Sequence, residues 1–454
     1  MTWVVRHDPF FWDTVQLASK HAHFFYQHQL QWAVLPPLID SGHPPFLGYY
    51  LATMWTFFGY NLPVSHFSML PFLCLLIWGL YRLAARLGTP YWAFWLLPLV
   101  LLDPVVAGQM VLVSPDIILL SFFVLALEGI LGNRLVYITL GVVGLSLVSM
   151  RGMMTAAGLG IFLSLRCWHL RTGFRYFWLQ AGCFLPGIAA ATAFLAWHWA
   201  QAGWIGYHAQ SAWAPAFQRV AGWGIVRNIA VLIWRWLDFG RVFEWLILLI
   251  LCVLWWKKRL RAPDTVLLLL VGCICFFLSI SAVLYQNLSA HRYFLPAYCA
   301  MHLLAFQWVI QSNQKQHIIR LTFLALSIGF ATGNLWIYPR GISMDWDATL
   351  AHQPYHALRA EALTYLDQQG IDYQSVGSAF PNLNTGIDLM LNDDKRRFSD
   401  IQFDQNQLIF VSNVMNDLQA SDFHRLDTAW IPRKRFAYAG VWIVLYQPAH
   451  STTR

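Results

Sequence analysis

Residues 263–284 read PDTVLLLLVGCICFFLSISAVL, an apolar stretch of the length needed to cross the hydrocarbon core of a bilayer. The chain contains about ten such stretches, and those that begin near residues 116, 135 and 152 are short. The others are 65–85, 90–111, 116–132, 135–150, 152–168, 176–199, 241–256, 293–311 and 319–338. This repetition predicts an all-α polytopic membrane protein, built as a bundle of transmembrane helices.

The composition of the 454 residues agrees with a protein folded in lipid. Hydrophobic residues make up 58% of the chain and charged residues only 11%, whereas an ordinary soluble domain has roughly 25% charged residues. Aromatic residues contribute 16%, which excludes a disordered chain. The formal net charge is +8, but no basic stripe with interleaved stacking aromatics is present in the sequence. We therefore expect membrane lipids and no nucleic acid as partners.

Basic residues gather at alternate joints between the predicted spans. By the positive-inside rule these joints face the cytoplasm. They carry Arg82, Arg86, Arg134, Arg166, Arg171, Arg175, Lys257, Lys258, Arg259, Arg261, Lys315 and Arg320. The sequence thus predicts a multi-pass protein of the cytoplasmic (inner) membrane. Its opposite, extracytoplasmic face would carry residues 1–62, the turn 103–116, the hairpin at Arg151, the loop 200–240, the turn 285–292 and the tail from 339.

Residues 1–338 are predicted to form the transmembrane domain, with 1–62 as its first extracytoplasmic loop. Within that loop, 10–26 and 46–58 mix aromatic and polar residues and read as helices at the membrane surface. The loop 200–240 contains several tryptophans and reads as a third interfacial element. Because the first loop has no apolar leader to carry it across the membrane, we expect a further transmembrane helix to precede Met1.

From residue 339 the sequence becomes polar and predicts a small extracytoplasmic α/β domain, 339–454. HALRAEALTYLDQQG has the pattern of an amphipathic helix that ends at Gly370. QLIFVSN and GVWIVLY have the pattern of short strands.

Ionisable residues at membrane depth are candidates for function because burying their charge is costly. Asp13 lies in FFWDT at the start of the first interfacial segment, although a helix N-terminus alone would also favour an acid there. His43 lies in DSGHPP, beginning with Asp40, whose prolines open the second interfacial helix. There it would face an anion beside unpaired backbone amides, and the alternative is a simple turn.

Three further positions fall on the same predicted face. Asp116 follows Pro115 at the start of a span, where it would also serve as a helix cap. Arg151 occupies a tight hairpin on the side that lacks other basic joints. Arg292 opens a span in HRYFLP, where snorkelling to lipid phosphates is the alternative role. Further possible site residues on this face are Asp40, Asp103, Tyr293 and His208.

Acids and cations around one outward cavity, bordered by interfacial helices, suit a substrate with a phosphate head and a hydrocarbon tail in the bilayer. An acid can deprotonate an acceptor hydroxyl while cations stabilise the departing phosphate.

The order of these residues resembles that of the GT-C superfamily of polyprenyl-phosphate-sugar glycosyltransferases. The shared pattern is an acid in the first outer loop, a basic residue before Pro-Pro, an Asp that opens a later span, a basic-Gly pair in a hairpin and Arg-Tyr-x-x-Pro at a span start. The protein O-mannosyltransferase group (glycosyltransferase family 39) and the lipid A aminoarabinose transferase group are the most similar branches. The resemblance covers about residues 1–300, and HPP with its spacing from Asp13 is its most specific part.

The resemblance implies a GT-C-like bundle and a role for each matching residue. Asp13 would be the catalytic acid that acts as general base, and Asp116 the second acid. His43, Arg151 and Arg292 would bind the donor phosphate. Thr14 stands where the family has the Glu of an Asp-Glu pair, so metal binding by that pair is in doubt and the cofactor stays undetermined, with a divalent metal as one option.

The resulting expectation is an inverting membrane glycosyltransferase. It would move a sugar from a polyprenyl-phosphate donor to a lipid, glycan or protein acceptor on the outer face of the cytoplasmic membrane. One alternative is a polyprenyl-lipid flippase or transporter that uses the same acids as a relay; it predicts broken spans with polar residues near the midplane. A second alternative is a non-catalytic envelope assembly or sensor protein whose function lies in the tail.

Overall fold

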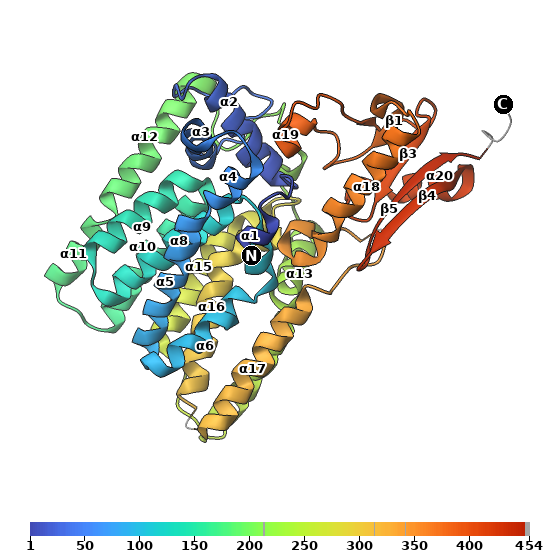
Figure 1. The fold of residues 1–454 in the computed structure, drawn as a ribbon. Helices are drawn as coiled ribbons and strands as arrows, with labels where there is room; N and C mark the ends of the chain where they lie inside the picture. The colour runs from blue at the N-terminus through green and yellow to red at the C-terminus, as the bar shows by residue number, and fades with distance from the viewer. Residues whose placement is uncertain (212–213, 313, 341, 450–454) are drawn as a thin grey trace.

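The computed structural model describes residues 1–211, 214–312, 314–340 and 342–449. This part of the chain is mostly helical, and one small sheet lies in the C-terminal region (Figure 1). The N-terminal helices and the C-terminal domain lie at one end of the bundle, whereas the turns between α5 and α6 and between α16 and α17 lie at the other end (Figure 1).

Helices form in all ten segments that the sequence predicted as spans, as the list of their bounds shows. They are α4 (Leu62–Phe67) and α5 (Leu70–Leu87), α6 (Pro90–Leu101) and α7 (Pro104–Val111), α8 (Pro115–Gly132), α9 (Leu135–Val148), α10 (Met150–His169), α11 (Phe174–Gly182) and α12 (Leu185–Ala202), α14 (Arg241–Trp256), α15 (Thr265–Leu284), α16 (Leu295–Ile310) and α17 (Gln316–Gly333).

Fewer of these helices meet the requirements of a membrane span than the sequence suggested. Among the described residues, five are long and apolar enough to cross a bilayer, and a sixth is counted if α6 and α7, bent by 74°, form one broken span. The other helices in the ten predicted segments are too short or too polar to pass this test of length and composition; α9 is short, for example, and α10 begins and ends near basic residues.

Two helices form the centre of the bundle, and both begin at the predicted site. Of the most apolar 18-residue stretch of α8, 78% is buried inside the protein. The corresponding stretch of the segment His291–Ile310, which contains α16, is 89% buried. Buried residues lie all round these helices, as expected for helices enclosed by others. Asp116 lies in the first turn of α8, and the 3₁₀ turn η3 (His291–Phe294) leads Arg292 into α16.

The interfacial segments predicted from the sequence are also helical. The first loop contains α1 (Thr2–Val5), a π-helix η1 (Val15–Lys20), α2 (His21–Gln27) and α3 (Phe46–Phe58). The region 200–240 contains η2 (Ala214–Phe217) and α13 (Trp223–Leu237), whose outer face exposes Trp223 and Trp234. The π geometry of the stretch after Asp13 was not predicted, and such geometry is rare and often found at functional sites.

The C-terminal domain is a five-stranded sheet in the order β2-β1-β3-β5-β4, with helices packed on it. Its elements are η4 (Trp346–Ala348), η5 (Leu350–His352), α18 (Pro354–Gln368), η6 (Tyr373–Ser375), β1 (Val376–Ser378), α19 (Gly386–Met390), β2 (Ser399–Asp400), β3 (Leu408–Ser412), α20 (Ala420–Ala429), β4 (Trp430–Tyr438) and β5 (Val441–Pro448). The predicted helix and the two predicted strands correspond to α18, β3 and β5. Gly370 has the positive φ expected of a residue just past a helix end.

Candidate active site between two cavities

Arg292 lies at the centre of the candidate site. Its guanidinium forms ion pairs with Asp13 and Asp347, and its Nε is 3.5 Å from Asp116 Oδ2. The Arg292 side chain is 7% exposed, so the three carboxylates compensate a charge that is almost fully removed from water. Two of the predicted acids, Asp13 and Asp116, therefore meet at one predicted cation.

Asp347 reaches Arg292 because the segment 346–348 packs closely against α7. A side chain at Gly108 would lie 2.8 Å from Thr349 N and 3.0 Å from Asp347 O, so only glycine allows this approach. The neighbouring Gln109 Nε2 donates a 2.7 Å hydrogen bond to Asp347 O. Asp347 was not among the site residues predicted from the sequence. The signal available was MDWD at 344–347, an acid beside an aromatic residue directly after the last span, as in FFWD.

Arg151 is the second cation of the site. Its Nη1 is 2.9 Å from Asp116 Oδ1, and its guanidinium lies over the Tyr293 ring at 4.0 Å from the ring centroid. Arg151 lies in the first turn of α10, directly after the break that Ser149 caps, rather than in the hairpin turn itself. Asp116 is fixed in turn by Ser114, whose side chain accepts from the Asp116 backbone N–H.

The DSGHPP loop places His43 beside Arg151. Asp40 holds the loop because its Oδ1 accepts from Gly42 N at 2.8 Å and its Oδ2 lies 2.9 Å from His198 Nε2. Gly42 has φ +69°, and a Cβ there would come within 2.6 Å of Gly206 O. Burial lowers the pKa of His43 to about 3, and the charge of Arg151 adds to the effect. His43 is therefore neutral at physiological pH and can donate one hydrogen bond but carries no charge.

Two cavities meet at these residues. The apolar cavity, about 500 Å³, is bordered by Asp13, His43, Arg151 and Tyr293. The rest of its wall is largely apolar and includes Leu17, Met150, Met153, Met154, Phe217 and Leu288. Methionine side chains adapt to irregular apolar ligands, so this wall suits a hydrocarbon chain that enters beside the cations.

The polar cavity, about 610 Å³, lies between the bundle and the C-terminal domain. Arg292 and Asp347 border it, together with Asp13 and Tyr293, which border the apolar cavity as well. Polar side chains are frequent in its wall, among them Arg235, Asn287, Ser289, Arg340, Asp345, Asn413, Asn416 and Gln419. Asp13 thus stands at the boundary between an apolar and a polar space.

Asp13 has one carboxylate oxygen engaged and one free for chemistry. Arg292 contacts Oδ2, whereas no side-chain hydrogen bond to Oδ1 is found within the described ranges. The Asp13 side chain is 23% exposed, so a ligand in either cavity can reach it. Its backbone follows Trp12, which has φ +52°, a conformation that few non-glycine residues adopt.

The structure places three of the possible site residues elsewhere. Asp103 is fully buried in a separate cluster, 3.1 Å from Arg241 and 3.5 Å from His302, and it caps α7 through Val105 N and Val106 N. Asp40 stabilises the loop that carries His43 by accepting a hydrogen bond from Gly42 N. His208 bonds to the Pro37 carbonyl at 3.1 Å and does not border either cavity. Tyr293, by contrast, borders both.

The carboxylates of the site do not form a cluster suited to a divalent metal. Among residues whose placement is described, no group of three or more His, Cys, Asp or Glu side chains could hold a metal ion. The three acids that meet here converge on the Arg292 guanidinium instead, and Thr14 donates to the Phe11 carbonyl rather than facing them.

The arrangement of the whole chain is shared with a known enzyme structure. The crystal structure of ArnT from Cupriavidus metallidurans bound to undecaprenyl phosphate matches with a TM-score of 0.55, covering 98% of this chain and 96% of that chain at 12% identity. The chain has the ArnT fold. The apo structure of the same ArnT matches with a TM-score of 0.53, with coverage of 98% and 95% and again 12% identity.

ArnT is the lipid A aminoarabinose transferase of the GT-C superfamily, so the resemblance that the sequence predicted is confirmed at the level of the fold. The ArnT-like fold and its apolar helices make this chain a multi-pass membrane protein. No protein-family model and no curated protein matches the sequence.

Proposed function

We propose that this protein is a membrane glycosyltransferase that moves a sugar from a polyprenyl-phosphate donor to an acceptor hydroxyl. The observation that carries the proposal is the position of Asp13, which borders an apolar cavity with cations and a polar cavity at the same time. A transferase needs these two environments to meet at one base, because its donor is a lipid and its acceptor group is polar.

The donor would occupy the apolar cavity. Its polyprenyl chain would lie against the methionine-rich wall, and its phosphate would lie beside Arg151 and the N–H of neutral His43. The solved ArnT with undecaprenyl phosphate bound supports a donor of this class. Arg292 borders the polar cavity, and its guanidinium already pairs with carboxylates. We therefore propose that Arg292 holds Asp13 and Asp116 in position and does not bind the phosphate directly.

The acceptor would approach from the polar cavity. Asp13 Oδ1 takes the proton of the acceptor hydroxyl as the hydroxyl oxygen attacks the anomeric carbon of the donor sugar. The bond between that carbon and the phosphate oxygen breaks, and its electron pair leaves with the phosphate. Arg151 and His43 stabilise the extra negative charge on the polyprenyl phosphate product.

The site would face the outside of the cytoplasmic membrane. This proposal rests on the basic joints predicted to be cytoplasmic, since the α5–α6 and α16–α17 turns that carry some of them lie at the end of the bundle away from the C-terminal domain (Figure 1). The acceptor, whether lipid, glycan or protein, would then be a component of the cell envelope.

The test is a transfer assay on the purified protein in detergent or nanodiscs. The protein is incubated with a set of undecaprenyl-phosphate sugars, each radiolabelled in the sugar, together with an extract of envelope lipids and glycans. The proposal predicts that label moves from one donor to a product and that free undecaprenyl phosphate appears in equal amount. Movement of intact donor between leaflets of a vesicle, without transfer, would indicate the flippase alternative instead.

A further inference from the structure

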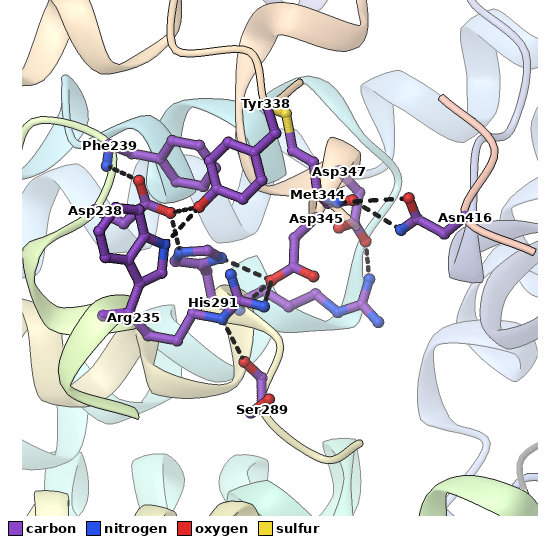
Figure 2. Close-up of polar contacts among 12 residues, drawn as sticks. Arg235, Asp238, Phe239, Ser289, His291, Tyr338, Met344, Asp345, Asp347 and Asn416 are labelled. Carbon is purple, nitrogen blue, oxygen red and sulfur yellow. Dashed lines mark hydrogen bonds and ion pairs between the residues drawn. The ribbon is translucent and has the colours of Figure 1, made fainter. Parts of the chain in front are cut away.

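His291 is held between two carboxylates, Asp238 and Asp345. These two acids differ from the three that pair with Arg292. The His291 Nε2 is 3.0 Å from Asp238 Oδ2, its Nδ1 is 2.6 Å from Asp345 Oδ2, and its backbone N–H donates to the same Asp345 oxygen at 2.9 Å (Figure 2). A carboxylate oxygen can accept a hydrogen bond from a ring N–H, so each ring nitrogen of His291 faces a carboxylate partner. The imidazole is fully buried and has no freedom to turn.

Further groups fix the two carboxylates. Asp238 accepts from the Tyr338 hydroxyl and from Phe239 N at 2.8 Å, and Asp345 lies 3.6 Å from Arg235 (Figure 2). Burial alone would raise the pKa of Asp345, but the charge of Arg235 and the hydrogen bonds of His291 hold this pKa well below its usual range. The pKa of Asp238 is likewise lowered against the effect of burial by His291 and Tyr338.

The contact joins three parts of the chain that are distant in sequence. Asp238 lies between α13 and α14, His291 lies in the turn that opens α16, and Asp345 lies in the segment that leads into the C-terminal domain. Asn416 of the C-terminal domain holds the same segment by two hydrogen bonds to the Met344 backbone, at 2.9 and 3.4 Å (Figure 2). We call the set Asp238, His291 and Asp345 the His291 clamp.

The clamp lies directly beside the site. Arg292 follows His291 in the chain, and Asp347 is two residues from Asp345. A shift of the His291 ring or of the Asp345 backbone would therefore move both partners of the Arg292–Asp347 ion pair. Because Arg292 also holds Asp13 and Asp116, the same shift would misplace the base.

We propose that His291 is a positioning residue of the transfer reaction, which acts through Arg292 to hold Asp13 at the boundary of the two cavities. The inference rests on the proposed function. It assigns to His291 no contact with either substrate, so it predicts an effect on turnover and little effect on donor affinity. Partners that orient metal ligands contribute roughly 10- to 100-fold to activity, and we expect an effect of similar size from a group that orients a catalytic base.

The chain offers a matched control in His302. This histidine is also fully buried between two acids, with Nδ1 2.9 Å from Glu244 and Nε2 3.5 Å from Asp103, but it lies outside both cavities. His291→Gln and His302→Gln therefore remove comparable buried contacts, and only the first adjoins Arg292. Both variants are purified, the folded fraction is measured by size-exclusion chromatography, and kcat and the donor KM are determined per folded molecule.

The expected result is a kcat about 10- to 100-fold lower for His291→Gln with a donor KM within about twofold of the wild type, and a kcat close to wild type for His302→Gln. Equal kcat values for the two variants, or a His291→Gln effect confined to KM, would overturn the positioning role while leaving the transferase in place. If the wild type transfers no sugar from any donor, the proposed function fails and the inference falls with it.

A milder variant decides the matter if His291→Gln does not fold. Asp238→Asn keeps the size and the accepting oxygen but removes the charge, so it weakens one side of the clamp. We expect kcat to fall by about 3- to 10-fold with an unchanged donor KM. A wild-type kcat in folded Asp238→Asn would contradict the proposal.

Discussion

Arg292 at the start of α16 forms an ion pair with Asp347, which lies beyond α17 in the segment that leads into the C-terminal domain. The guanidinium that holds the predicted acids Asp13 and Asp116 thus also pairs with an acid from the C-terminal part of the chain. The C-terminal domain is consequently part of the site rather than an appendage, because its first segment supplies one of the three carboxylates around Arg292.

Replacement of Asp347 tests this relationship. Asp347→Asn removes one of three negative charges from Arg292, so Arg292 should bind Asp13 more tightly and make it a weaker base. We expect kcat for sugar transfer to fall by roughly 10-fold or more. Asp427→Asn is the control, because Asp427 pairs with Arg340 on the exposed surface and should leave kcat unchanged. Equal activity of the two variants would contradict a role for Asp347.

The apolar cavity predicts a different kinetic effect for Arg151. Arg151→Gln removes the charge beside the proposed phosphate, and a charge-assisted hydrogen bond contributes about 1.5–3 kcal/mol, so affinity for undecaprenyl phosphate should fall roughly 10- to 100-fold. Titration of the purified protein with undecaprenyl phosphate, followed by tryptophan fluorescence, measures this affinity. Arg171→Gln, in the turn between α10 and α11, is the control. Unchanged affinity in Arg151→Gln would place the phosphate elsewhere.

The low pKa of His43 predicts a dependence of stability on pH. The unfolded chain binds a proton at His43 near pH 6.5, whereas the folded chain does so only near pH 3. As the pH falls below 6.5, the unfolded state gains protons that the folded state cannot, so folded stability is lost. His43→Gln should therefore lose about 1 kcal/mol less stability than the wild type between pH 7.5 and 5.5. Thermal unfolding in detergent at both pH values checks this, and identical losses would refute it.

Local sequence patterns predicted much of the fold. Helices form in all ten apolar stretches that were predicted as spans, and the two predicted strands correspond to β3 and β5. Strand β4 was missed because its sequence, WIPRKRFAY, contains a proline and three consecutive basic residues that break the alternation. Such residues are tolerated there because β4 is an edge strand that pairs only with β5 among the described strands.

The candidate residues Asp13, His43, Asp116 and Arg151 could be selected from local signals, namely the helix starts and prolines beside them. The individual pairs that join distant segments could not be predicted. Nothing near Asp347 or Asp238 in the sequence indicates that they face Arg292 and His291, because the fold of the whole chain creates these pairs. The same reason explains Asp103, which was a possible site residue on the predicted outer face but pairs with Arg241 instead.

The Asp13→Asn variant shows whether Asp13 is the general base between the two cavities. The amide keeps the size of the side chain but cannot accept the proton, so kcat should fall by roughly 10² or more. Undecaprenyl phosphate should still bind, because Arg151 and His43 remain in place. Asp8→Asn is the matched control, since Asp8 lies on the same segment but borders a different cavity. We expect Asp13→Asn to bind undecaprenyl phosphate normally and to transfer almost no sugar, whereas near wild-type turnover in this variant would exclude Asp13 as the general base.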